Sequence, residues 1–548
     1  MRSLSPDKIR NVALVAHGDA GKTTLAEAML FTGGSVSRMG NVDDGSSALD
    51  FAENEKKRQI TINLGLGHCT WNGAKINILD CPGYADFYGD VKAGLRVADA
   101  AIVVIAAPSG VEVGTELVWQ FIESANLPRM ICVNKMDKEH ADFRKCLDAV
   151  TDVLGARVAP VVIPIGAADS FRGVVDLIER KAYISDGSGK ARKEEIPADM
   201  ADEVAELRTQ LIEAAAESDE QLMEKFFGDE ELTPDEIRWG LRAGVAAATI
   251  VPVVATVAIS AAGIAPLMDL VAGVMPAPAD APEVRGTKPG EEDDVTLSAT
   301  PDAPFSALVF KTVSEQHVGE LLFFRVYSGT IRSGSDVLNS TNGESERMGS
   351  IYALIGHDRK EMESVSAGDI AGVVKLKVTS TGDTLSTKAN PIVLPTVVLP
   401  KPVLSEAVRS KKKGDEEKIA TGLAKLHEED PTFTAGYDRV IRQTIISGLG
   451  VLHLDVMIEK LKNKFGVELE REKPRIPFRE TIRGTASAEG KYKKQTGGRG
   501  QFGVAWLRLE PVERGSGFEF ANEVVGGSIP SKFIPAVEKG VKERMEAG

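Results

Sequence analysis

The feature that most constrains this chain is a phosphate-binding loop close to its N-terminus. The segment AHGDAGKT (16–23) matches the pattern GxxxxGK[ST], with Ala16 in the first glycine position. It follows the apolar run 12–16 and precedes a helical pattern, which is the context that such a loop requires. Backbone N–H groups and the helix N-terminus can then hold the α- and β-phosphates. Lys22 would reach the β- and γ-phosphates, and the Thr23 hydroxyl would bind Mg²⁺.

Two further motifs indicate that the nucleotide is GTP. DCPG (80–83) ends a predicted strand, where Asp80 can reach Mg²⁺ and the Gly83 N–H can meet the γ-phosphate. NKMD (134–137) ends another strand. The Asp137 carboxylate can accept hydrogen bonds from N1–H and the exocyclic amine of guanine, a donor pair that adenine lacks. A helix N-cap is the plainer role for this aspartate, but three motifs in this order and context favour a GTP site with Mg²⁺.

Strand and helix patterns alternate through the N-terminal half and predict a parallel α/β sheet covered on both faces. The candidate strands are the apolar runs 12–16, 76–79, 101–106 and 130–133, with a further run at 251–259. An insertion at about 158–249 interrupts the alternation with an exposed loop, 185–193, and an amphipathic helical stretch, 201–227. The sequence therefore predicts a P-loop domain with an inserted subdomain.

The rest of the chain predicts three further domains. Residues 280–304 are rich in Pro, Gly, Asp and Glu, which is typical of a linker. The expected domains are 1–282 for nucleotide binding, 283–400 as a β-barrel, 401–478 as an α+β domain with helices at 416–429 and 456–465, and 479–548 as a partial fourth α+β domain with a helical pattern at 535–547. The predicted fold class is thus multidomain α/β and β.

Composition excludes several classes of protein. The four cysteines all lie in the first third without C-x-x-C spacing, so we expect neither disulfides nor a zinc site, and a cytoplasmic location. The uncharged stretch 244–268 is long enough to span a membrane, but its prolines and glycines favour a buried strand, so we expect no membrane partner. The net charge of −15 does not by itself suggest a nucleic-acid partner, although the segment from Lys473 onward is locally basic.

Long motifs in every predicted domain make the chain resemble translational GTPases, and most closely elongation factor G. They are VGELLFFRVYSGTIRSG (318–334), AGDIAGVVKLKVTSTGDTL (367–385), EEDPTF (428–433), QTIISGLGVLHLDV (443–456), EGKYKKQTGGRGQFG (489–503) and RGSGFEFANEVVGG (514–527). The resemblance implies a GTPase that acts on the ribosome, with ribosomal RNA and proteins as partners and tRNA and mRNA in the decoding region, in translocation or subunit recycling. We expect a monomer.

The resemblance also assigns site residues. Residues 50–62 would be the first switch, with Thr61 as a Mg²⁺ ligand and γ-phosphate sensor, and 80–90 the second, while 491–503 would lie at the tip of the fourth domain, near RNA. The expected catalytic residues are Lys22, Thr61, Gly83 and Tyr84; the expected metal ligands are Thr23, Thr61 and Asp80. The expected GTP/GDP-binding residues are Ala16, His17, Gly18, Asp19, Ala20, Gly21, Lys22, Thr23, Thr24, Asp80, Cys81, Pro82, Gly83, Tyr84, Asn134, Lys135, Met136, Asp137, Val257 and Ala258.

Departures from the family pattern gather where the γ-phosphate would lie. Tyr84 stands where the family has the histidine that orients the attacking water, and Gly18 stands where it has an apolar residue that gates that water with Ile60. Gln59 replaces a glycine of the first switch. Elsewhere, the Ser-Ala loop near guanine aligns with 257–258, although Ser260-Ala261 is close by, and Val451 replaces a glutamate. These changes leave the phosphate cradle intact, so we expect GTP binding with weakened hydrolysis.

Three functional interpretations remain open at this point. The first is a divergent elongation-factor-G paralogue; the second is a ribosome-binding GTP switch or recycling factor with little hydrolysis. A ribosome-protection protein ranks third, since that class usually keeps the histidine. Because family members continue through the rest of the fourth domain and a fifth, we expect a chain that is C-terminally truncated, ending at Gly548.

Overall fold

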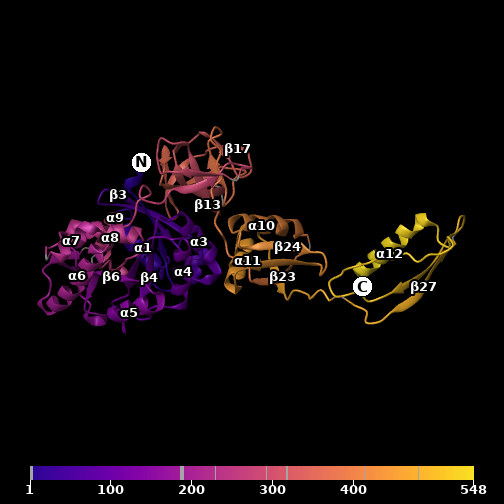
Figure 1. The fold of residues 1–548 in the computed structure, drawn as a ribbon, viewed down its shortest axis with the longest axis horizontal. Coiled ribbons are helices and arrows are strands. Elements are labelled where there is room, and N and C mark those ends of the chain that lie inside the picture. Colours follow the sequence, from indigo (N-terminus) through magenta and orange to yellow (C-terminus); the bar gives the residue numbers. More distant parts are fainter. Residues whose placement is uncertain are drawn as a thin grey trace. The chain divides into compact units, whose positions relative to one another are not determined.

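The computed structural model describes residues 4–185, 191–228, 230–291, 293–315, 319–412, 414–478, 480–495 and 497–547. The chain forms two compact units, one of residues 1–437 with 444–473 and the other of residues 438–443 with 474–548. Figure 1 shows the first unit from indigo to orange and the helix of the second in yellow.

A 10-stranded sheet in the order β2-β3-β1-β4-β5-β10-β6-β7-β8-β9 forms the base of the N-terminal domain. Its strands are β1 (Ile9–Val15), β2 (Gly65–Trp71), β3 (Ala74–Asp80), β4 (Ala100–Ala106), β5 (Arg129–Asn134), β6 (Val158–Ile165), β7 (Gly173–Asp176), β8 (Lys181–Ser185), β9 (Ala191–Glu194) and β10 (Val251–Ala255). The run from β3 to β6 pairs in parallel. This confirms the predicted parallel α/β sheet.

The inserted segment extends the same sheet. Strands β7, β8 and β9 add to β6 in antiparallel fashion, so the insertion begins as a continuation of the sheet's edge. Residues 191–193, predicted as part of an exposed loop, instead pair with β8 because exposed side chains do not prevent backbone pairing at a sheet edge; residues 186–190 of that predicted loop lie outside the described residues. The predicted helical stretch 201–227 forms two helices, broken where Asp219 caps the second.

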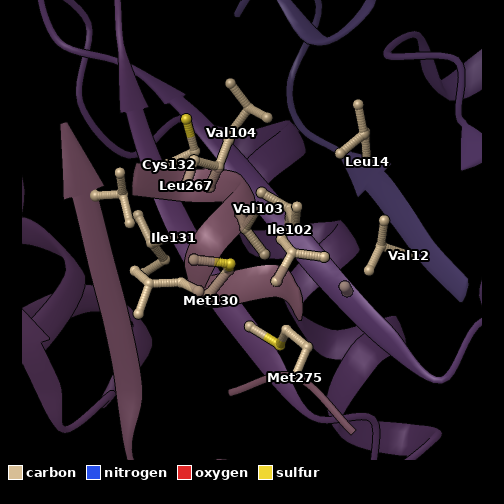
Figure 2. Packing of buried hydrophobic residues seen from close by; sticks show 14 of the residues in the cluster. Val12, Leu14, Ile102, Val103, Val104, Met130, Ile131, Cys132, Leu267 and Met275 are labelled. Carbon is tan, nitrogen blue, oxygen red and sulfur yellow. The ribbon is translucent and has the colours of Figure 1, made fainter. Parts of the chain in front are cut away.

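Helices pack against the sheet and bury its apolar core. They are α1 (Lys22–Thr32), α2 (Glu53–Arg58), α3 (Tyr88–Val97), α4 (Val113–Ser124), α5 (Phe143–Leu154), α6 (Ala201–Ala216), α7 (Glu220–Phe227), α8 (Pro234–Ala246) and α9 (Ile264–Gly273). In Figure 2, aliphatic and sulfur-containing side chains of β1, β4 and β5 pack with Leu267 of α9 and with Met275. All of these strands are buried along their whole length, which explains their uninterrupted apolar sequences.

The uncharged stretch 244–268 is divided among α8, β10 and α9, so it forms no single continuous helix and contains a buried strand, as its prolines and glycines indicated. Across the described ranges, no helix is both long and apolar enough to cross a membrane. The four cysteines are buried and free. The predicted strand at 251–259 is shorter in the structure and ends at Ala255. The chain then turns to form a loop beside the nucleotide motifs.

The second domain is an antiparallel β structure built around its own apolar core. It contains β13 (Ser306–Glu315), β14 (Gly319–Ser328), β15 (Thr330–Arg332), β16 (Asp336–Asn339), β17 (Ser345–Arg347), β18 (Ile351–Ile355), β19 (Asp358–Met362), β20 (Ser364–Ser366), β21 (Ile370–Val374) and β22 (Thr384–Ser386). The preceding segment, predicted as a linker, contains the hairpin of β11 (Val284–Thr287) and β12 (Asp294–Leu297). That hairpin is held by a bridge between Thr287 and Val393, a tertiary pairing that local composition does not reveal.

The third domain is α+β, as predicted. It consists of β23 (Leu404–Ser410), α10 (Glu416–Glu429), β24 (Thr434–Asp438), β25 (Gln443–Gly448), α11 (Val451–Phe465) and β26 (Leu469–Glu472). Helix α11 begins five residues before the predicted start at 456. In the second unit, β27 (Ala486–Lys494) pairs with β28 (Gln501–Leu509), and α12 (Ile534–Ala547) follows. Of the predicted basic tip, 491–503, residues 491–494 and 501–503 belong to the paired ends of these two strands, and residue 496 lies outside the described residues.

Candidate nucleotide-binding site

The phosphate-binding loop joins β1 to α1 with a backbone that admits few side chains. Asp19 and Gly21 both have left-handed φ angles, +60° and +92°. A Cβ atom on Gly21 would lie 2.5 Å from Asn134 Nδ2, so this position requires glycine on two grounds. Helix α1 begins immediately afterwards at Lys22. The helix N-terminus therefore points into the space that the loop encircles, which is the arrangement that holds phosphate groups.

Lys22 lies at the centre of this loop. Its ammonium donates a hydrogen bond to the His17 carbonyl, 3.1 Å away, and a Cβ on Gly83 would lie 2.5 Å from the same Nζ atom. Burial lowers the pKa of Lys22, although the nearby Asp80 carboxylate opposes the change. A buried cation beside a helix N-terminus, with the Gly83 backbone against it, is suited to a phosphate that spans both.

Hydroxyl and carboxylate groups gather beside Lys22. The Thr23 and Thr61 hydroxyl oxygens lie 2.8 Å apart, and the Thr61 hydroxyl donates to Asp50 Oδ2 over 3.2 Å. Among the described residues, both carboxylate oxygens of Asp80 and the Oδ1 atom of Asp50 are buried without a hydrogen-bond partner. Burial raises the pKa of Asp80 to about 7, and burial with the Asp80 charge raises the pKa of Asp50 to about 8. Buried carboxylate oxygens without a hydrogen-bond partner, both of Asp80 and one of Asp50, beside two hydroxyls fit a hard divalent cation such as Mg²⁺.

The motif 134–137 ties three loops together. Asn134 Nδ2 donates to the Ala20 carbonyl over 3.1 Å, and its Oδ1 accepts the Ala258 N–H over 3.0 Å. The Lys135 ammonium donates to the Asp19 carbonyl over 2.5 Å. The Asp137 carboxylate, by contrast, remains partly exposed and faces the cavity, 3.3 Å from the Lys138 ammonium. Asn134 and Lys135 are thus structural supports, while the Asp137 carboxylate, paired with Lys138 at the cavity wall, is placed to contact a base.

The second switch brings Tyr84 over the phosphate-binding loop. The Tyr84 hydroxyl donates to Asp19 Oδ2 over 3.3 Å. Its ring lies against Gly18, where a Cβ atom would approach the ring carbons to 3.3 Å. Gln59 adopts a left-handed φ of +56° and donates to the Asp43 carbonyl over 2.8 Å, which explains why a glycine would suit this position.

A cavity of about 270 Å³ unites these elements. Of the predicted residues, those that line it are Gly18, Asp19, Gly21, Lys22, Thr23, Thr24, Thr61, Gly83, Tyr84, Asn134, Lys135, Asp137, Val257 and Ala258. The others lie behind this lining: Ala16, Ala20, Asp80, Cys81, Pro82 and Met136 are buried beneath it. His17 points elsewhere, since its Nδ1 accepts the Gly114 N–H over 3.2 Å. Val257 and Ala258, which align with the family's Ser-Ala loop, line the cavity, whereas the nearby Ser260 and Ala261 are not part of its lining.

Sequence reasoning missed several residues of this site. Val42, Asp43, Lys138 and Ile259 also line the cavity, and no local pattern marks them. Glu27 was detectable, because a carboxylate interrupts the apolar face of α1. It is fully buried and accepts hydrogen bonds from Ser47 Oγ and from the N–H groups of Gly40, Ala48 and Leu49, so it holds the segment that leads into the first switch.

The third domain contacts both switches. Ile62, Phe87 and Val456 form one buried apolar cluster, against which Ile60, Tyr84 and Leu452 pack. The side chain of Asp86 accepts the His453 N–H of α11 over 3.1 Å. Lys57 and Arg58 both form ion pairs with Glu459 on the same helix. The switches are therefore in contact with the third domain as well as with the cavity.

The fold and the site define a P-loop nucleotide-binding protein of several domains. Comparison with known families matches residues 7–277 to the elongation factor Tu GTP binding domain, 304–388 to elongation factor G domain 2, 399–473 to elongation factor G domain III and 474–548 to elongation factor G domain IV. Among solved structures, the crystal structure of ttk003000868 from Thermus thermophilus matches with a TM-score of 0.86 and 34% identity, over 98% of this chain and 78% of that one.

The chain belongs to the elongation factor G family of translational GTPases. The family and the fold class expected from the sequence are thereby confirmed. The four matched segments follow the chain in the order of the four expected domains.

Proposed function

We propose that this protein binds GTP and GDP with Mg²⁺ and acts on the ribosome as an elongation-factor-G-like factor, in tRNA and mRNA translocation or a related step. The observation that carries the proposal is the convergence of Lys22, the Thr23–Thr61 pair and Asp137 on one cavity. Lys22 and the N-terminus of α1 would hold the phosphates. Asp137 would accept two hydrogen bonds from guanine and so reject adenine.

The metal site would use the hydroxyls of Thr23 and Thr61, with Asp80 beneath them. Mg²⁺ supplies charge neutralisation between the β- and γ-phosphates when it is bound. The unpartnered oxygens of Asp80 support this assignment, because a buried carboxylate without a partner is costly unless a cation offsets its charge.

Competition binding tests the nucleotide assignment. Fluorescent GDP should be displaced by unlabelled GTP and GDP in the presence of Mg²⁺ and not by ATP. Asp137→Asn should weaken guanine binding by about 1.5–3 kcal/mol, the usual contribution of a hydrogen bond to a charged group. Asp142→Asn is the matched control, since Asp142 is a helix N-cap outside the cavity and Asn caps helices equally well. Equal displacement by ATP and GTP would contradict the assignment.

The ribosome is the proposed partner, with contacts to ribosomal RNA and proteins and to tRNA and mRNA at the decoding end. The basic end of the β27–β28 hairpin supports this: its exposed cations are Lys491, Lys493, Lys494 and Arg499. Each phosphate that such cations neutralise makes binding steeper in salt. Reversal of these charges should weaken co-sedimentation with ribosomes at moderate salt; unchanged co-sedimentation would remove the hairpin from the interface. A cytoplasmic monomer is the form that we propose.

A second function, a ribosome-binding switch that hydrolyses GTP slowly, is favoured by the position of Tyr84. Its hydroxyl donates its one proton to Asp19. Burial, with the charge of Asp19, raises the pKa of Tyr84, so the phenol stays neutral and cannot supply positive charge to a transition state. Phosphoryl transfer depends on positioning and charge stabilisation, and both are reduced by this arrangement. We therefore propose slow hydrolysis by an otherwise complete binding site.

A further inference from the structure

The Tyr84 ring fills the space in which a side chain at position 18 of the phosphate-binding loop would lie. The ring of Tyr84 occupies the space beside Gly18 so closely that a Cβ atom there would lie 3.3 Å from two ring carbons, Cε2 and Cζ. Gly18 has no left-handed backbone angle that would itself require glycine. Glycine at position 18 is therefore needed to make room for the Tyr84 ring, and not to allow the backbone conformation of the loop.

The same ring is held at its far end. Its hydroxyl donates to Asp19 Oδ2 over 3.3 Å, and Asp19 belongs to the same loop as Gly18. Tyr84 also packs against the apolar cluster of Ile62, Phe87 and Val456, which joins both switches to the third domain. Gly18, Asp19 and Tyr84 all line the cavity, so the bonded pair forms part of the cavity wall.

We propose that Tyr84 and Asp19 form a latch across the phosphate-binding loop, which Gly18 makes possible and which must open for the bound nucleotide to leave. Asp19 acts here as a positioning residue, through Tyr84. The latch rests on the proposed function, because it presumes that the cavity holds a guanine nucleotide. Tyr84 would thus have two effects: it replaces the group that orients the attacking water, and it helps to retain the bound nucleotide. Its contact with the apolar cluster also gives the third domain a route to loosen the latch.

Three substitutions open the latch in different ways. Tyr84→Phe keeps the ring and removes the hydroxyl. Asp19→Asn keeps an acceptor oxygen and a residue type that tolerates a left-handed backbone, but removes the charge. Gly18→Val restores an apolar side chain and displaces the ring. Tyr352→Phe is the matched control, because Tyr352 lies on β18 of the second domain, outside both switches and the cavity.

Release of a fluorescent GDP analogue, chased with excess GDP in a stopped-flow instrument, measures the latch. Tyr84→Phe and Gly18→Val should each release the analogue about two- to tenfold faster than the parent, the effect of losing one hydrogen bond. Asp19→Asn should have a smaller effect and add nothing to Tyr84→Phe. Tyr352→Phe should match the parent. Release at the parental rate in Tyr84→Phe, or effects that multiply in the double variants, would overturn the latch.

Failure of the proposed function is distinguishable from failure of the latch. If the parent itself does not bind the analogue, the GTP-binding proposal fails. The latch then falls with it, and the Tyr84–Asp19 hydrogen bond itself is tested by the thermal unfolding midpoints of the nucleotide-free parent, Tyr84→Phe, Asp19→Asn and their double variant. Non-additive midpoint shifts would support a direct hydrogen bond between the two side chains, and additive shifts would refute it.

Discussion

The turn at Gly356 attaches the second domain to β2 and to the segment just before the first switch, and a single methyl group there should loosen this contact. Gly356 joins β18 to β19 with a left-handed φ of +54°, and its N–H donates to the Leu66 carbonyl of β2 over 2.8 Å. A Cβ atom at this position would lie 1.7 Å from the Ala48 carbonyl oxygen. Ala48 lies two residues before the first switch, so the backbone of one domain must move away from the other in Gly356→Ala.

The expected size of the effect follows from these contacts. An alanine in a left-handed conformation costs about 1–2 kcal/mol, and loss of the hydrogen bond to Leu66 adds about 0.5–1.5 kcal/mol. Gly343→Ala is the matched control: it has a left-handed φ of +81° in the same domain, and a Cβ atom there has no neighbour within 4 Å. Both variants share the conformational cost, so the difference between them measures the contact with Ala48.

Urea unfolding and hydrogen–deuterium exchange together test this reasoning. Gly356→Ala should lower the free energy of unfolding by about 0.5–1.5 kcal/mol more than Gly343→Ala, because the conformational cost cancels in the comparison. Amide exchange should rise in the segment around Ala48 and in β2, and not in the interior of the second domain. Equal destabilisation by the two substitutions, with unchanged exchange around Ala48, would refute the proposed contact.

Two further predictions concern the third domain. In Gly450→Ala, the new Cβ atom would lie 2.3 Å from Asp86 Oδ1, in an extended backbone that alanine adopts freely, so amide exchange at the start of α11 should rise several-fold. The control Gly436→Ala has open space around its Cβ atom and should have no such effect. Equal exchange in both variants would argue against the contact between residue 450 and Asp86. Burial acts to raise the pKa of Asp430, but the hydrogen bond from His453 outweighs it and holds this pKa well below its ordinary value of 3.8. Ionised Asp430 therefore contributes stability above about pH 4 that is lost as the pH falls below this value. Asp430→Asn should lower the melting temperature at pH 7 and the deficit should shrink towards pH 2; a deficit independent of pH would contradict the role of this charge.

The core of the fold and the cradle of the site follow from local sequence. The buried strands β1, β4 and β5 are uninterrupted apolar runs. The phosphate-binding loop at 16–23 is identified by its glycines and its lysine. Such features depend on neighbours within a few residues, so periodicity and motif spacing identify them.

The features that sequence reasoning missed depend on tertiary contacts. The start of α11 at Val451 lies where Asp86 of the first domain accepts the His453 N–H, and no signal near residue 451 encodes that contact. The hairpin within the predicted linker depends on the bridge to Val393. The sequence indicated that Gly18 and Tyr84 are both unusual, but only the structure shows that one makes room for the other.

Single-turnover GTP hydrolysis, with and without ribosomes, tests the central claim that the binding site is intact while the hydrolytic group is altered. The parent should bind GTP and hydrolyse it slowly in both conditions. Tyr84→His, which restores the family's histidine, should raise the ribosome-stimulated rate about ten- to hundredfold, the value of a charged hydrogen bond regained in the transition state. A parent that already matches a histidine-bearing elongation factor G, together with no rise in Tyr84→His, would contradict the account.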